Sequence, residues 1–356
     1  MGKTIVLTGG GTAGHVTPNL ALLPGLRERG FDIHYIGSYN GIEKDLMAKA
    51  GVDYTGISTG KLRRYLSKEN IIDIGNVIRG IREARKVLRE LKPDIVFSKG
   101  GYVAVPVVRA AAAQHVPVII HESDMTPGLA NKLCYSAAQK ICCNFPETLK
   151  LLPKDKAVLS GSPIRAELLS GTREAGLAFT GLSGEKPVLL MIGGSSGARI
   201  LNERLRSSLD QLLPVFDIVH LCGKGNLDET LTRPGYLQYE YISEELKDLF
   251  ALADVVFSRA GANAICELLA LRKPALLVPL SKAASRGDQI LNARSFESQG
   301  FSMVIEEEDL TDERLVDGLL SLYEHRDQYI AKMAESAQSN GVDVILGLID
   351  ELTAAE

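Results

Sequence analysis

Two glycine-rich segments carry the residues of this sequence that are best suited to chemistry. GGGTAGH at 9–15 follows the apolar run 4–8, and GGSSGAR at 193–199 follows the apolar run 188–192. Glycines between a strand and a helix let the backbone turn tightly and approach a ligand, and the free N–H groups of the helix start attract an anion. Both segments therefore predict sites for a phosphate-bearing ligand.

Histidine and carboxylate side chains at expected strand ends are candidates for proton transfer. His15 closes the first glycine segment, and its unperturbed pKa of about 6.5 suits a general base near neutral pH. His121 and Glu122 follow the buried run 118–120 at the same expected edge, and Glu122 is the alternative base. Each of them could instead be a structural hydrogen-bonding residue. We interpret the remaining histidines as structural: His34, His115, His220 and His325.

The second half offers two side chains suited to sugar hydroxyls. Glu267 lies in the early turns of the helix that should follow Gly261, where a carboxylate either favours the helix dipole or accepts from two vicinal ribose hydroxyls. Gln289 follows the polar loop after the apolar run 276–279, and its amide could hydrogen-bond a sugar.

A sequence motif that occurs twice in the chain predicts two similar domains. DIVFSKGG at 94–101 matches DVVFSRAG at 254–261, and each reads as a buried strand that ends in a hydroxyl, a cation and a tight turn. Strand and helix patterns alternate on both sides of residue 165. We expect an α/β protein with two doubly wound domains facing a cleft, at 1–165 and 166–341. The last amphipathic stretch, 342–356, could pack back on the first domain.

The first helix shows a start signal and an interruption. Thr17 is expected as its N-cap with Pro18 at the first helical position, and Gly30 should end it. Pro24, in the middle, should produce a kink.

The sequence lacks residues that several well-known classes of nucleotide-dependent enzymes require. Gly9, Gly11 and Gly14 satisfy GxGxxG, but the run 33–38 has no carboxylate at its end to hold an adenosine ribose, which argues against a nicotinamide oxidoreductase. His15 stands where an ATPase loop would carry lysine. No Asp-x-Asp pair occurs, so we expect no metal requirement and no cofactor. The five cysteines show no metal-binding spacing and should be reduced core residues.

Composition indicates a globular protein with one basic segment. The chain has 356 residues, 45% of them hydrophobic, and a formal net charge of −4. No apolar stretch reaches the roughly 20 residues of a spanning helix, so we expect the protein to stay in the cytoplasm. Residues 61–92 combine ten cations with an apolar face at helical spacing, formed by Ile71, Ile74, Ile78, Ile81 and Leu88. We expect a surface helix with this apolar face on the domain core and its cations in solvent. The start of the segment, where Tyr65, Leu66, Ile71 and Ile72 lie beside Arg63, Arg64 and Lys68, could instead rest on an anionic membrane.

Seven short motifs together carry a family resemblance. They are GGTAGH at 10–15, GGYV at 100–103, HE at 121–122, PGLANK at 127–132, GSPIR at 161–165, GGSSGAR at 193–199 and RGDQ at 286–289. In this order they resemble the MurG family of glycosyltransferases, and the resemblance runs in register from Gly9 to Gln289. It implies a GT-B fold of two Rossmann-like domains, with the acceptor bound mainly by the first and UDP-N-acetylglucosamine by the second.

The resemblance also implies roles for individual residues. In the first domain the diphosphate and sugar would be approached by Thr12, Ala13 and Gly14, with His15 as the base. The nucleotide and its phosphates would contact Arg165 and Ser195, and Ile242 would line the uracil site. The uridine-binding turn would consist of Ala262, Asn263, Ala264, Ile265, Cys266 and Glu267, and Gln289 would hold the transferred sugar. Asp124, where many members have asparagine, receives no role.

The activity implied by the resemblance is inverting transfer of N-acetylglucosamine to the C4 hydroxyl of the muramyl sugar of lipid I, which forms lipid II. The enzyme would act in cell-wall synthesis, and so in cell shape and division, as a peripheral protein on the cytoplasmic side of the cell membrane. We expect no nucleic-acid partner. Alternatives are another GT-B glycolipid transferase, a UDP-N-acetylglucosamine epimerase, or a non-catalytic UDP-sugar-binding partner of a membrane enzyme.

Overall fold

The chain divides into two compact units in the computed structural model. The structure describes residues 2–61, 68–194, 197–282, 287–336, 338 and 341–354. Unit 1 consists of 1–165 and 340–356, and unit 2 of 166–339. Each unit is an α/β domain with its own sheet and is described by itself.

Unit 1 contains a seven-stranded sheet in the order β3-β2-β1-β4-β5-β6-β7, with every pair of neighbours parallel. Its strands are β1 (Thr4–Thr8), β2 (Asp32–Ser38), β3 (Asp53–Ile57), β4 (Ile95–Ser98), β5 (Val118–Glu122), β6 (Lys140–Cys143) and β7 (Ala157–Leu159). The central strands are buried along almost their whole length because helices cover both faces of the sheet.

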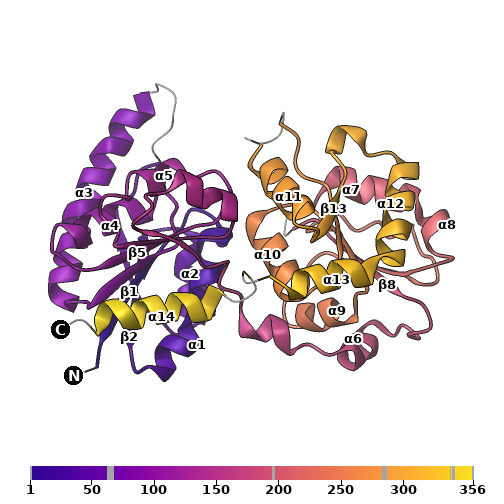
Figure 1. The fold of residues 1–356 in the computed structure, drawn as a ribbon, viewed down its shortest axis with the longest axis horizontal. Helices are drawn as coiled ribbons and strands as arrows, with labels where there is room; N and C mark the ends of the chain where they lie inside the picture. The colour runs from indigo at the N-terminus through magenta and orange to yellow at the C-terminus, as the bar shows by residue number, and fades with distance from the viewer. Residues whose placement is uncertain are drawn as a thin grey trace. The chain divides into compact units, whose positions relative to one another are not determined.

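Helices pack on both faces of this sheet (Figure 1). They are α1 (Thr17–Glu28), α2 (Ile42–Lys49), α3 (Lys68–Leu91), α4 (Ala104–Ala112), α5 (Leu129–Lys132) and α14 (Gly341–Thr353), with short 3-10 turns η1 (Ala13–His15) and η2 (Pro146–Leu151). Alternate residues of β1 enter different cores: Ile5 and Leu7 pack with α1 and α14, whereas Val6 packs on the side of α3 and α4.

Helix α14 is held on unit 1 by both apolar and charged contacts. A Cβ on Gly25 of α1 would lie 2.3 Å from Cδ1 of Leu346, so the two helices touch at a position without a side chain. Arg29 Nε donates to Asp350 at 2.9 Å, and Ile345 and Ile349 are fully buried. The end of the chain thus completes one layer of the first unit.

Unit 2 repeats the architecture with a six-stranded parallel sheet in the order β10-β9-β8-β11-β12-β13. The strands are β8 (Val188–Ile192), β9 (Asp217–Leu221), β10 (Tyr236–Tyr239), β11 (Val255–Ser258), β12 (Ala275–Leu277) and β13 (Ser302–Val304). Its helices are α6 (Arg173–Thr180), α7 (Arg199–Ser207), α8 (Leu209–Leu212), α9 (Leu246–Leu252), α10 (Ala262–Ala270), α11 (Asp288–Ser298), α12 (Asp312–Glu324) and α13 (Arg326–Ala334), with 3-10 turns η3 (Ala166–Ser170) and η4 (Glu307–Asp309).

The repeated sequence motif has the same structural function in both units. Asp94 Oδ2 accepts from the backbone N–H of Thr4 at 2.6 Å, and Asp254 Oδ2 accepts from that of Val188 at 2.8 Å. Each aspartate precedes a central strand and ties it to the start of the neighbouring one. The expected fold class, two doubly wound α/β domains, is confirmed.

Two local predictions were wrong. Thr17 is the first residue of α1 and not its N-cap, because η1 runs almost directly into the helix and the buried Val16 takes the cap position. On α3, Ile74 and Ile78 were expected on the core face but are 50% and 47% exposed. Ile81 and Leu88 do face the core as expected, together with Ala84 and Leu91.

The prediction for the cysteines is confirmed. All five cysteines are free and buried. No helix in the described part of the chain is long and apolar enough to span a membrane. The segment around Arg63, Arg64, Tyr65 and Leu66 lies outside the described residues, as do Ser195 and Arg286.

Candidate active site

The first glycine segment lies where the strand order of unit 1 reverses. β1 and β4 are neighbours, but the chain continues from them to opposite sides of the sheet, and such a point leaves a crevice at the carboxyl ends of the strands. The loops after β1 and β4 meet there: a Cβ on Gly101, whose φ is +80°, would lie 2.3 Å from the carbonyl oxygen of Gly10. Only glycine allows this approach of two backbones.

His15 lies at the end of this loop with a defined hydrogen bond. Its Nδ1 is 2.9 Å from Oγ1 of Thr12, and its backbone N–H donates to the Thr12 carbonyl at 3.1 Å. Burial, and secondarily the positive charge of Lys99, lowers the pKa of His15 to about 4. The imidazole is therefore neutral at pH 7, which is the protonation state that a general base requires.

Lys99 is a fully buried cation behind the same loop. It follows β4, and its Nζ lies 3.0 Å from Nδ1 of His121 and also donates to the hydroxyl of Ser123. Because the ammonium can only donate, Nδ1 of His121 accepts, and Nε2–H donates to the Gly161 carbonyl at 3.0 Å. Burial and Lys99 hold the pKa of His121 well below its usual value. His121 is thus a neutral structural link to the 161–165 motif.

Glu122 uses its carboxylate to hold a neighbouring loop. Oε2 accepts from the backbone N–H of Gly128 and from Nδ2 of Asn131, both at 2.9 Å, and Oε1 accepts from the N–H of Ser123 at 3.1 Å. Burial raises the pKa of the carboxyl. Gly128 and Asn131 of the PGLANK motif are thus the residues that Glu122 holds. These contacts favour a positioning role for Glu122 over a role as the general base.

A second set of side chains, from β2, α1 and α2, contacts the first glycine segment and the end of β1. The hydroxyl of Tyr35 donates to the Gly9 carbonyl at 2.8 Å, and Asn19 Nδ2 donates to the Thr8 carbonyl at 3.3 Å. Glu43 is fully buried against Gly10, with Oε1 accepting from the hydroxyl of Ser38 at 2.6 Å. The surrounding side chains therefore hold the loop in place.

Unit 2 has the corresponding strand reversal between β8 and β11. The second glycine segment follows β8, and the turn at Gly261 follows β11 and starts α10. Glu267 lies in the second turn of α10 and is partly exposed, as is Ile242 in the connection between β10 and α9. Gln289, near the start of α11, accepts from the backbone N–H of Leu280 at 3.1 Å through Oε1, so its amide nitrogen is the end that can donate to a ligand.

Arg165 is the last residue of unit 1 and has an unused donor. Its Nε is buried, and no group of the described residues accepts from it. A buried guanidinium N–H without an acceptor is costly, so an anionic ligand at this position would complete its hydrogen bonding. Among the described residues no cluster of three or more His, Cys, Asp or Glu side chains is arranged to hold a metal ion.

Sequence reasoning did not assign functions to Lys99, Asn131 or Glu43. Lys99 and Asn131 were visible only as members of motifs, and nothing signalled that Lys99 contacts His121 or that Asn131 contacts Glu122. Glu43 lies in a helix whose other charged residues are solvent-exposed, and its burial gave no sequence signal.

Comparisons with known proteins assign a family domain to each of the two units. Residues 5–143 match the glycosyltransferase family 28 N-terminal domain, and residues 188–346 match the glycosyltransferase family 28 C-terminal domain. These two matches, on the two α/β units, define a glycosyltransferase. The chain belongs to glycosyltransferase family 28.

Individual relatives agree over nearly the full length. A protein of Lachnoclostridium phytofermentans is 60% identical and one of Lachnospira eligens is 59% identical, each over 98% of this chain and 99% of the relative. Both are named UDP-N-acetylglucosamine–N-acetylmuramyl-(pentapeptide) pyrophosphoryl-undecaprenol N-acetylglucosamine transferase. The crystal structure of Acinetobacter baumannii MurG is 25% identical with a TM-score of 0.78, covering 98% of this chain and 99% of that one.

Proposed function

We propose that this enzyme transfers N-acetylglucosamine from UDP-N-acetylglucosamine to the muramyl sugar of undecaprenyl-pyrophosphoryl-MurNAc-pentapeptide, in peptidoglycan synthesis. The observation that carries the proposal is the near-complete match, at about 60% identity, to relatives named for this reaction. The acceptor is bound by unit 1 and the donor by unit 2.

The reaction is an inverting displacement. The C4 hydroxyl of the acceptor attacks the anomeric carbon of the donor sugar, a new C–O bond forms, and the bond to the diphosphate breaks with UDP taking the electron pair. His15 accepts the hydroxyl proton at Nε2, because Nδ1 is engaged with Thr12. General-base assistance of this kind typically contributes about 10²–10⁴-fold.

The leaving diphosphate gains negative charge, and positive groups stabilise it. The backbone N–H groups of the second glycine segment and the buried donor of Arg165 support this role. Ser195 would add a contact, and Glu267 and Gln289 would bind the ribose and the sugar. These groups suffice in our proposal without a metal ion, so turnover should survive EDTA. Collapse in EDTA with recovery in magnesium would contradict this part.

Membrane attachment is a further part of the proposal. Ile74 and Ile78 lie one turn apart on α3 and are about half exposed, and Arg79, Arg82 and Arg85 are exposed nearby. Exposed apolar groups beside cations suit the cytoplasmic, anionic surface of a membrane. Replacing Ile74 and Ile78 by serine should weaken sedimentation with anionic vesicles, whereas unchanged sedimentation would place the attachment elsewhere.

The activity itself is tested with purified protein, UDP-N-acetylglucosamine and the lipid-linked acceptor, with the product identified by mass. The proposal predicts one added N-acetylglucosamine on the acceptor and release of UDP that depends on the acceptor. Release of UDP or a changed sugar without any acceptor would instead identify an epimerase or hydrolase.

A further inference from the structure

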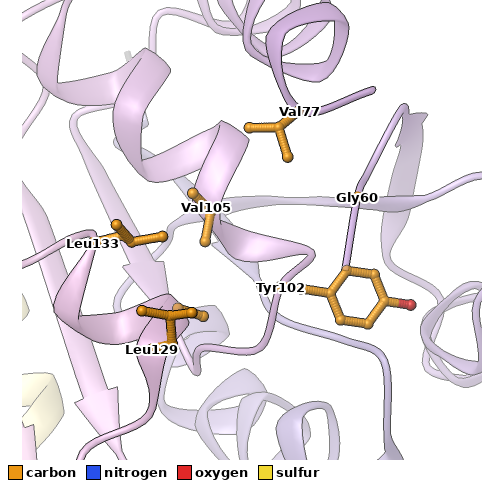
Figure 2. Close-up of a pocket in the computed structure, with 7 residues that line it drawn as sticks. Gly60, Val77, Tyr102, Val105, Leu129 and Leu133 are labelled. Atoms are coloured by element: carbon orange, nitrogen blue, oxygen red, sulfur yellow. The ribbon is translucent and has the colours of Figure 1, made fainter. Parts of the chain in front are cut away.

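An apolar pocket opens beside the first glycine segment of unit 1. It encloses about 260 Å³, including space open to solvent, and no charged side chain lines it. Four aliphatic side chains point into one space: Val77 of α3, Val105 of α4, Leu129 of α5 and Leu133, which directly follows α5. The Tyr102 ring lies at the edge of this space (Figure 2). Because the enclosed part of this space is small, the pocket suits only a segment of an apolar chain and not a whole drug-sized ligand.

Tyr102 connects this pocket to the glycine loop. A Cβ on Gly11 would lie 2.5 Å from Cε1 of Tyr102, so the ring lies directly against the loop backbone. One edge of the ring thus borders the predicted phosphate site and the other borders the apolar space. A ligand whose pyrophosphate lies on the loop would bring a group attached to that pyrophosphate toward the pocket.

Apolar surface continues outward from the pocket. Leu133 is 41% exposed at its rim, and Ile74, one helical turn before Val77, is half exposed. Residues three apart on a helix are neighbours on its surface. An apolar chain leaving the pocket along α3 would therefore stay in contact with apolar side chains.

We infer that this pocket binds the first part of the polyprenyl chain of the acceptor, next to its pyrophosphate. The inference rests on the proposed function, because only an acceptor of that type joins a pyrophosphate to a long apolar chain. The pocket would make the enzyme select prenyl-linked acceptors in addition to recognising the sugar and the phosphates.

The test compares two acceptors in detergent without phospholipid. Both carry pyrophosphoryl-MurNAc-pentapeptide, one with a polyprenyl chain and one with a methyl group. Leu133→Gln makes the rim polar, and Val77→Phe fills the pocket, where Val77 is a lining residue. Leu151→Gln is the matched control, since Leu151 is 56% exposed and does not line the pocket.

Both pocket variants should raise KM for the polyprenyl acceptor by about three- to tenfold and leave the methyl acceptor unchanged, as expected for losing burial of a few carbon atoms. Equal effects on both acceptors, or none on either, would overturn the inference while leaving the proposed function intact. So would variants that lose vesicle binding but keep normal KM in detergent, because that result would make the pocket a membrane anchor. No transfer by the wild type to either acceptor would contradict the proposed function itself.

Discussion

Lys99 Nζ lies 3.0 Å from Nδ1 of His121, in the interior of unit 1 and next to the loop that carries His15. Its charge lowers the pKa of His15, although burial is the larger cause. Lys99→Met should therefore raise the pKa of His15 and move the acid limb of the kcat/KM profile to higher pH. NMR titration of the His15 ring measures the same shift without turnover.

The sign follows from the charge that is removed. Without the neighbouring ammonium the imidazolium form is less disfavoured, so protonation begins at a higher pH and the base is lost earlier on acidification. Lys99→Arg keeps the charge and should keep the profile. A His15 titration identical in wild type and Lys99→Met would show that Lys99 does not tune it.

Thr12 should control the tautomer of His15. For Nε2 to accept a proton, Nδ1 must carry the hydrogen and donate it to Oγ1 of Thr12. Thr12→Val removes that acceptor and should lower kcat by about three- to tenfold, the scale of one hydrogen bond. Thr12→Ser keeps the hydroxyl and should restore most of the rate. Equal rates in the valine and serine variants would speak against this geometry.

Glu122 should act through the loop it holds. Glu122→Gln replaces one accepting oxygen by a donor, which then opposes either the N–H of Ser123 or the pair formed by Gly128 N–H and Asn131 Nδ2, so the free energy of unfolding should fall by about 1–3 kcal/mol. Turnover should fall while the acid limb of the pH profile stays in place. The exposed Glu28→Gln is the control for charge removal. Loss of the acid limb with normal stability would instead identify Glu122 as the base.

The fold could be predicted because its signals are local. Short, mainly apolar strands that end at glycine turns, such as 4–8 and 188–192, can be recognised without knowledge of distant contacts. The Thr17 cap was mispredicted because a threonine before proline is a local start signal, whereas the actual start depends on the preceding 3-10 turn and the burial of Val16.

The internal connections of the site could not be predicted in the same way. Lys99 and His121 are 22 residues apart on neighbouring strands, and their contact depends on strand order and on the burial of both side chains. The faces of α3 also depend on packing, because isoleucines at helical spacing do not reveal which side meets the sheet.

Glu267 should bind the ribose of the donor. Glu267→Ala is expected to weaken UDP-N-acetylglucosamine binding by about 1–3 kcal/mol, the cost of losing charged hydrogen bonds in a partly buried site. Calorimetry measures the change, and a UDP-sugar lacking both ribose hydroxyls is the control because its affinity should hardly respond. The same loss with both ligands would show that Glu267 does not contact the ribose.

The rate of a single turnover shows whether His15 takes the acceptor proton in a glycosyl transfer. Wild type and His15→Ala are mixed with saturating UDP-N-acetylglucosamine and lipid-linked acceptor, and the disaccharide-lipid product is followed by mass, with thermal unfolding as the check on folding. The account predicts a folded variant whose product forms at least about 100-fold more slowly. Product formation at a near-normal rate in His15→Ala would contradict it.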